Sequence, residues 1–250
     1  MSKQTFRDHF SSSSPAYARF RPRYPQALFD WIAAEAPAAT RVWDCATGTG
    51  QAAADLAARF THVIATDASR AQLSAAAPHP RVSYVQSTAE ASGLASKCAD
   101  AVVAAQAVHW FDMPAFFREA GRVARAGALV AVWTYGNVRL PPEIDAIFLP
   151  FYENVVGPYW PPERRLIERE YVDVPIPFTP VEAPVLTMET SMTMAGLEGY
   201  IGTWSATARY RQALGHDPVP GFMARVAEVW GDPASVKPAD WPLTIKAGRV

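Results

Sequence analysis

The chain has 250 residues, half of them hydrophobic and 19% charged, and its formal net charge is −1. This length is enough for one globular domain with a full core, together with an elaborated cap. The near-neutral charge gives no electrostatic reason to expect nucleic acid or a membrane surface as the main partner. No run of about 18 apolar residues occurs, so no membrane-spanning helix is predicted.

The N-terminal segment and the cysteines bear on the cellular compartment and on metal binding. The segment from Met1 to Phe10 is polar, which is not typical of a secretory signal peptide. Cys45 and Cys98 are the two cysteines, and no group of Cys, His or Asp has the spacing of metal ligands. We therefore expect a cytoplasmic protein without a metal.

From the N-terminus, a polar segment that contains Tyr17 and Arg21 precedes an amphipathic helix predicted over residues 26–36. Short apolar runs then alternate with helical patterns, which indicates a parallel sheet covered on both faces. The predicted strands are residues 41–45, 63–66, 82–85, 101–105 and 128–134, and the predicted helices between them are residues 51–60, 69–77 and 114–123.

The composition changes after Tyr135. Residues 136–200 are rich in proline and aromatic side chains and too long for a simple connection, so they predict a cap or a substrate-binding region. Further strands are expected near 185–194 and 243–247, and helices near 197–214 and 221–230. The aromatic side chains of this half either line an apolar acceptor pocket or belong to the core: Trp133, Tyr135, Phe151, Tyr152, Tyr159, Trp160, Tyr200 and Trp204.

The most informative stretch is the loop from Asp44 to Gly50, which follows the first predicted strand. The spacing from Gly48 to Ala53 fits a dinucleotide fingerprint, which is a weak signal by itself. The Asp44 carboxylate would repel a pyrophosphate, whereas it would hold the ammonium group of an amino acid. Asp67 ends the second apolar run, where a carboxylate can bind ribose hydroxyls or cap a helix. This pattern favours S-adenosylmethionine over NAD.

Residues 44–50 resemble motif I of class I S-adenosylmethionine-dependent methyltransferases, with Ala46 in place of the first glycine. Residues 17–25, 87–90 and 106–111 resemble the type 11 methyltransferase group, in the branch related to trans-aconitate methyltransferases. The resemblance covers roughly residues 5–136. It implies a doubly wound α/β fold with a seven-stranded, mostly parallel sheet in the order 3-2-1-4-5-7-6. The last strand would be antiparallel, and a helical cap would be inserted between the fifth and sixth strands.

The resemblance also implies residue roles. The methionine part would lie against the first loop, the ribose and adenine against the ends of the second and third strands, and the sulfonium above the end of the fourth. A lid would come from the N-terminal segment. The cofactor-binding residues would be Tyr17, Arg21, Asp44, Ala46, Thr47, Gly48, Gly50, Asp67, Ala68, Thr88, Ala89, Glu90, Gln106 and Ala107.

His109 is the candidate catalytic residue, because it follows the fourth strand. It would serve as a base if the methyl acceptor is a hydroxyl or an amine, whereas a carboxylate needs no base. The alternative is a structural histidine that packs against Trp110 and Phe111.

We therefore expect methyl transfer from S-adenosylmethionine to an oxygen, nitrogen or carboxylate of a small molecule, with S-adenosylhomocysteine as the product. The alternatives are an NAD(P)-dependent oxidoreductase and a non-catalytic S-adenosylmethionine-binding protein. The expected organisation is a lid segment and first helix over residues 1–40, a cofactor-binding core over 41–136, and a cap with the last strands over 137–250. The protein would be a monomer or a homodimer.

Overall fold

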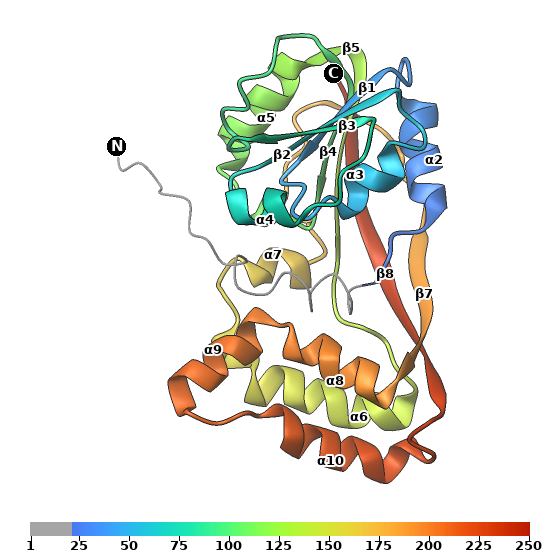
Figure 1. The fold of residues 1–250 in the computed structure, drawn as a ribbon, viewed down its shortest axis with the longest axis vertical. Coiled ribbons are helices and arrows are strands. Elements are labelled where there is room, and N and C mark those ends of the chain that lie inside the picture. The colour runs from blue at the N-terminus through green and yellow to red at the C-terminus, as the bar shows by residue number, and fades with distance from the viewer. Residues whose placement is uncertain (1–21) are drawn as a thin grey trace.

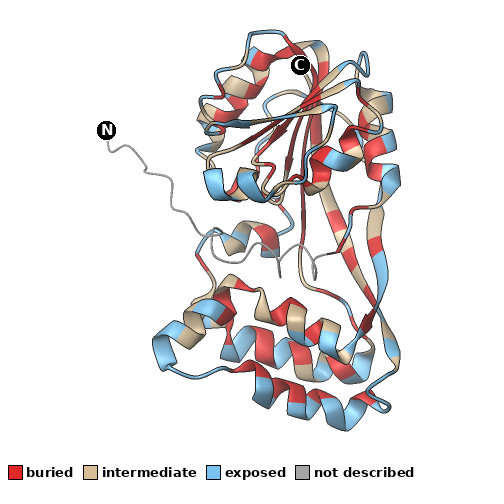
Figure 2. Ribbon diagram, in the orientation of Figure 1, coloured by how far each residue is buried: buried red, intermediate tan, exposed pale blue. Residues whose placement is uncertain are grey.

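The computed structural model describes residues 22–250. Figure 1 shows an α/β core joined by long strands to a lobe made of helices. In Figure 2 the buried residues follow the strands of the core and the inward faces of the lobe helices. No helix in the described part of the chain is long and apolar enough to cross a membrane.

Five parallel strands form the core sheet, and each ends near the position expected from the sequence. Their side chains alternate between two hydrophobic clusters, as a sheet buried on both faces requires. Val42, Val103 and Trp133 pack on one face with α2 and α3, whereas Trp43, Val102 and Val132 pack on the other with α5. The elements are β1 (Arg41–Cys45), β2 (His62–Asp67), β3 (Val82–Gln86), β4 (Ala99–Ala105), β5 (Ala124–Tyr135), α2 (Gln26–Glu35), α3 (Gln51–Leu56), α4 (Arg70–Ala75) and α5 (Met113–Val123).

The strand order confirms the expected topology. Along the sheet it is β3-β2-β1-β4-β5-β8-β6, and β7 also pairs with β8. Strand β8 (Val236–Arg249) is antiparallel to β5 and to both of its outer partners. The expected sixth strand is divided into two pieces along the outer edge of β8, namely β6 (Thr179–Pro180) and β7 (Leu186–Thr193).

The helical lobe is larger than the single insertion expected between the fifth and sixth strands, because the helices predicted near 197–214 and 221–230, which lie between β7 and β8, also pack in it. The two sets share one core: the Phe148 ring lies 5.7 Å from Trp204 and 6.4 Å from Phe222. Each set thus buries its apolar face against the other. The first set is α6 (Pro142–Pro150), the π-helical turn η2 (Phe151–Val155), η3 (Gly157–Tyr159) and α7 (Arg164–Glu168), and the second is α8 (Met194–Gly202), α9 (Ser205–Leu214) and α10 (Val219–Trp230).

Candidate active site

The loop after β1 turns sharply because three of its residues have left-handed backbone. The φ angles are +56° at Ala46, +58° at Gly48 and +83° at Gly50. Glycine adopts this conformation freely, whereas the Cβ of alanine makes it strained. A Cβ on Gly50 would also overlap the Tyr84 hydroxyl, so that position requires glycine for space as well. Ala46 therefore carries strain that the glycine of the methyltransferase motif would avoid.

Asp44 is completely buried at the end of β1. Its Oδ2 accepts a hydrogen bond of 2.5 Å from the Thr47 hydroxyl, while its Oδ1 has no hydrogen-bond partner in the described structure. Burial raises the pKa of this carboxyl to about 7, against the opposing effect of the Thr47 hydrogen bond, and the charge of Asp67 adds to the rise. A buried oxygen without a donor is costly, so the site is suited to a ligand that brings one.

Asp67 connects the loop to the end of β2. Its Oδ2 accepts the Gly48 N–H at 2.9 Å, and its Oδ1 accepts the Ser69 N–H at 2.8 Å. The cap of helix α4 is Ser69, whose hydroxyl accepts the Gln72 N–H. Asp67 thus holds the loop in place without being the helix cap, and its carboxylate is partly buried.

The residues predicted after β3 lie in different environments. Thr88 is exposed and forms a short bridge with Ala91, whereas Ala89 is buried in the core. Glu90 is partly buried and accepts the Asp112 N–H at 3.1 Å, which ties this turn to the start of α5. Of the three, Ala89 uses its side chain for packing.

Gln106 follows β4 and also has left-handed backbone, with φ +53°. Its side chain is bound to the end of β5: Nε2 donates to the Tyr135 carbonyl at 3.1 Å, and Oε1 accepts from the Thr134 hydroxyl at 2.6 Å. Ala107 beside it is buried. The Gln106 side chain is therefore held against the end of β5 by two hydrogen bonds.

His109 lies in the short 3-10 helix η1 (Val108–Trp110) and is buried. Its Nδ1 is 2.8 Å from the Tyr171 hydroxyl, and its ring centre is 4.9 Å from that of Trp110. Burial, together with the charge of Arg164, lowers the pKa of the imidazole to about 3. His109 is therefore neutral at ordinary pH, and it is bound to a partner that the sequence did not reveal.

Tyr171 is completely buried at a strained turn, where its φ is +53°. The Lys246 ammonium, from β8, donates to the carbonyl oxygens of Tyr171, Val172 and Val174 at 2.9–3.0 Å. These bonds fix the turn against the sheet. The contact between His109 and Tyr171 spans 62 positions of sequence, and no motif in the sequence marks it.

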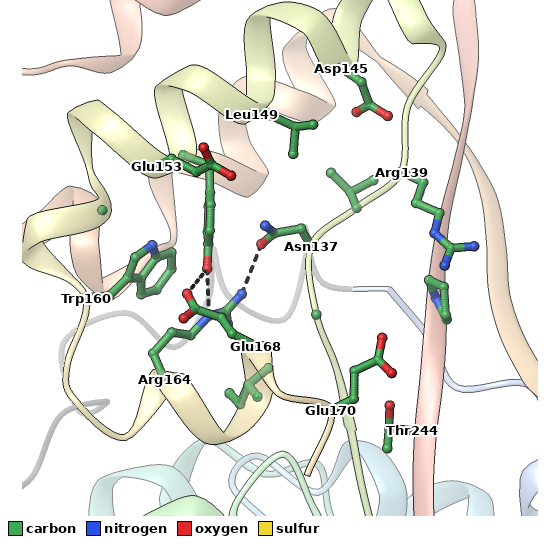
Figure 3. A pocket seen from close by; sticks show the side chains of 16 residues that line it. Asn137, Arg139, Asp145, Leu149, Glu153, Trp160, Arg164, Glu168, Glu170 and Thr244 are labelled. Atoms are coloured by element: carbon green, nitrogen blue, oxygen red, sulfur yellow. Dashed lines mark hydrogen bonds between the residues drawn. The ribbon is translucent and has the colours of Figure 1, made fainter. Parts of the chain in front are cut away.

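A cavity of about 710 Å³ lies between the end of β5, the first helices of the lobe and β8 (Figure 3). Arg164 is held there by neutral partners: Nε donates to the Tyr152 hydroxyl at 3.0 Å and Nη2 to Asn137 Oδ1 at 3.0 Å. Its guanidinium also lies 4.5 Å from the centre of the Trp160 ring. Of the aromatic residues proposed from the sequence, Tyr152 and Trp160 line this cavity, and the buried core contains Trp133, Tyr135, Phe151, Tyr200 and Trp204.

The structure thus brings Asp44, Asp67 and Gly48 together in one loop, and Gln106 and His109 at the end of β4. Of the predicted cofactor-binding residues that the structure describes, none lines the cavity. Tyr17 and Arg21 lie outside the described residues. Within residues 22–250 there is no group of three or more His, Cys, Asp or Glu side chains that could hold a metal ion.

Comparison with known proteins agrees with this arrangement. The family described as methyltransferase domain matches residues 43–132. A protein of Dictyostelium discoideum named as a methyltransferase is 33% identical over 219 residues, which are 86% of this chain and 83% of that protein. An uncharacterised methyltransferase of Mycobacterium tuberculosis is 38% identical over 133 residues, or 52% of this chain and 54% of its own length.

Solved structures extend the likeness to nearly the whole chain. A structure described as a type II methyltransferase from Anaeromyxobacter dehalogenans is 43% identical, with a TM-score of 0.86, and the match covers 92% of this chain and 97% of that one. A methyltransferase structure from Bacillus halodurans, with 20% identity and a TM-score of 0.51, shares the fold. The branch related to trans-aconitate methyltransferases stays a prediction. The chain belongs to the class I S-adenosylmethionine-dependent methyltransferases.

Proposed function

We propose that this chain transfers a methyl group from S-adenosylmethionine to a small molecule and releases S-adenosylhomocysteine. The observation that carries the proposal is Asp44 Oδ1, a buried carboxylate oxygen without a donor at the start of the cofactor loop. The ammonium group of the cofactor's methionine part would supply that donor. A pyrophosphate would instead bring more negative charge beside Asp44, which argues against a dinucleotide.

Other residues of the chain would complete the cofactor site. Asp67, at the end of β2 beside the loop, would bind the ribose hydroxyls. The turn with Thr88, Ala89 and Glu90 would border the adenine. Gln106 and Ala107 would lie below the sulfonium. When bound, S-adenosylmethionine supplies a methyl group made electrophilic by that sulfonium, and the chain has mainly to align the acceptor with it.

The cavity beside α7 is the site we propose for the acceptor. Its volume of about 710 Å³ lies within the usual range for small-molecule sites, about 300–1,000 Å³. Glu170 lines it and directly precedes Tyr171, which binds His109. Arg164 also lines it, and its helix α7 contacts η1, the 3-10 helix that contains His109. The cavity is therefore adjacent to the candidate catalytic residue.

Titration calorimetry with the whole chain tests the cofactor. We expect S-adenosylhomocysteine to bind with micromolar or better affinity and NADH to give no heat. Binding of NADH without S-adenosylhomocysteine would contradict the proposal.

The catalytic part is tested with His109→Ala, in which turnover and cofactor affinity are measured separately. If His109 contacts the acceptor, methyl transfer falls at least about tenfold while S-adenosylhomocysteine affinity is kept. Unchanged turnover of an identified substrate would remove His109 from the mechanism.

A further inference from the structure

The Arg164 guanidinium is held at the cavity wall by groups that carry no charge (Figure 3). Nε donates to the Tyr152 hydroxyl at 3.0 Å, and Nη2 donates to Asn137 Oδ1 at 3.0 Å. Arg164 takes part in none of the ion pairs that the described residues form. A partly buried cation without a counter-ion favours a ligand that brings a negative charge.

Two hydrogen-bond donors at this wall are left without an acceptor. A guanidinium group can only donate, so the oxygen of the Asn137 amide must face Arg164, and Asn137 Nδ2 is the free end. Arg164 Nη1 likewise has no acceptor among the described residues. Neither nitrogen is among the fully buried polar atoms that lack a partner, so both keep accessible surface. Because both residues line the cavity, their free N–H groups are available to one ligand there.

The position of the guanidinium is fixed before any ligand arrives. Its central carbon lies 4.5 Å from the centre of the Trp160 ring and 5.7 Å from the centre of the Tyr152 ring. The Tyr152 hydroxyl accepts from Arg164 and uses its own hydrogen to bond Glu168 Oε1 at 2.7 Å. A binding group that is already held in one position loses little conformational entropy when a ligand binds. Arg164 is therefore preorganised as a donor.

The other charged side chains of the cavity are mostly acidic. The carboxylates that line it are those of Asp145, Glu153, Glu168 and Glu170. Arg139 also lines it but lies 4.0 Å from Asp240, whereas Arg164 has no acidic partner among the described residues. The carboxylates of Glu153 and Glu170 form no hydrogen bond or ion pair with any described residue. A second negative charge on a ligand would be repelled by these carboxylates.

We infer that Arg164 and Asn137 form a subsite for a carboxylate of the methyl acceptor, and that the acceptor carries this one negative charge and no second. The inference rests on the proposed function, in which the cavity holds the acceptor. A carboxylate presents two oxygen atoms in a plane, which suits the planar donors of a guanidinium and an amide. A phosphate monoester, with a charge of about −1.5 to −2 at pH 7, would bring excess negative charge against the acidic walls. The far end of the acceptor is therefore neutral or positively charged.

Four small aromatic probes test the subsite by calorimetry with the whole chain at low salt, where exposed charges are screened least. Benzoate and 4-(aminomethyl)benzoate carry one carboxylate, terephthalate carries two, and benzylamine carries none. We expect benzoate to bind with a dissociation constant on the order of 1 mM, and benzylamine to bind at least about tenfold more weakly. Terephthalate should bind at least about tenfold more weakly than 4-(aminomethyl)benzoate, which has the opposite charge at the same place.

Three results with the unmodified chain would overturn the inference. They are benzylamine that binds as tightly as benzoate, terephthalate that binds as tightly as 4-(aminomethyl)benzoate, and benzoate that does not bind at about 10 mM.

Asn137→Asp is the sharpest variant, because it keeps an oxygen facing Arg164 and supplies the missing counter-ion. It should fold as well as the unmodified chain and weaken benzoate binding at least about tenfold. Arg164→Gln should weaken benzoate binding to a similar extent, and the exposed neighbour Arg165→Gln is the control that should leave it within about twofold. S-adenosylhomocysteine affinity and thermal melts show that the variants are folded. Unchanged benzoate binding in folded Asn137→Asp would overturn the subsite.

Glu153→Gln combined with Glu170→Gln tests the exclusion of a second negative charge. Removal of both carboxylates should raise the affinity for terephthalate at least about threefold relative to that for benzoate. An unchanged ratio of the two affinities in the folded double variant would overturn the exclusion.

Cofactor binding separates the failure of this inference from that of the proposed function. If benzoate binds and Asn137→Asp abolishes its binding, but S-adenosylhomocysteine does not bind, the proposed function is contradicted and the carboxylate subsite stands. If S-adenosylhomocysteine binds and benzoate does not, the subsite is overturned and the proposed function stands.

Discussion

The cofactor loop takes its contacts from a short stretch of sequence, whereas the cavity takes its walls from distant ones. The side-chain and loop contacts of Asp44, Gly48 and Gly50 are with Thr47, Asp67 and Tyr84. The cavity is lined by residues from Gly136 to Thr244, which come from the segment after β5, from α6, α7 and the turns around them, and from β8. We therefore expect cofactor binding to depend on a local motif with a fixed backbone, and acceptor choice, at the cavity proposed for it, to depend on the packing of the lobe. The two functions should therefore respond separately to substitution.

Among these variants, Asp44→Asn should have the largest effect, a loss of cofactor affinity at the loop of the α/β core. Loss of the charge-assisted bond to an ammonium group, worth about 1.5–3 kcal/mol, should weaken S-adenosylhomocysteine binding about 10- to 100-fold. Calorimetry at pH 8 measures this loss. Affinity in the unmodified chain should also fall as the pH drops below about 7, because the pKa of Asp44 is raised to that value and its neutral form does not attract the ammonium.

The same variant should stabilise the free protein. The folded pKa of about 7 exceeds the usual 3.8, so folding favours the protonated carboxyl, and this contribution is complete below pH 4 and lost as the pH rises through 7. The raised pKa allows Asp44→Asn to gain at most about 4 kcal/mol of unfolding free energy at high pH. We expect about half of that gain, because the asparagine amide also lacks hydrogen-bond partners. In thermal melts, the difference in melting temperature between Asp44→Asn and the unmodified chain should widen from pH 4 to 7 and stay constant above pH 7. A gap that narrows over this range would contradict the burial argument.

Arg164→Gln should have an intermediate effect, confined to the lobe. It removes two hydrogen bonds and the contact with Trp160, so we expect the free energy of unfolding to fall by about 1–2 kcal/mol. S-adenosylhomocysteine affinity should stay within about twofold. The exposed neighbour Arg165→Gln is the control and should change neither quantity. A tenfold loss of cofactor affinity in Arg164→Gln would break the separation between the two regions.

Ala46→Gly should have the smallest effect. Relief of the left-handed strain, about 1–2 kcal/mol, is partly offset by the greater freedom of glycine in the unfolded chain, which leaves a gain of about 0.5–1 kcal/mol in urea unfolding. Gly48→Ala is the matched reverse change. Its Cβ would meet nothing closer than Gln72 Oε1 at 3.9 Å, so it introduces strain without a clash and should destabilise. Equal stability of the two variants would show that φ does not govern this loop.

The sequence predicted the core well, because its features repeat at short range. Alternation of apolar runs and helical patterns located the five parallel strands, and the acid before the glycines indicated a charged partner at that loop. The order of the strands came from the family resemblance and is confirmed. The predicted roles of Glu90, Gln106 and His109 stay predictions.

The lobe and the partner of His109 could not be predicted in this way. Two separate insertions form one helical core, and the sequence of neither segment indicates that it packs against the other. Tyr171 is one of nine tyrosines, and its selection depends on a turn fixed by Lys246 from a strand that lies 75 positions later. Arg164 could not be told from its neighbour Arg165 by sequence, since only packing holds one beside Tyr152 and leaves the other exposed.

Strand β8 belongs to both parts of the molecule, and this limits how the enzyme can move. Residues 243–249 pair with β5 in the core, and residues 236–243 pair with β7 at the base of the lobe. Figure 1 shows the strand running without interruption from one part to the other. We expect this continuous pairing to resist bending between the core and the lobe. We expect β8 to fix the distance between the proposed cofactor and acceptor sites. Substrates should then enter by movement of side chains and short turns rather than by rotation of the lobe.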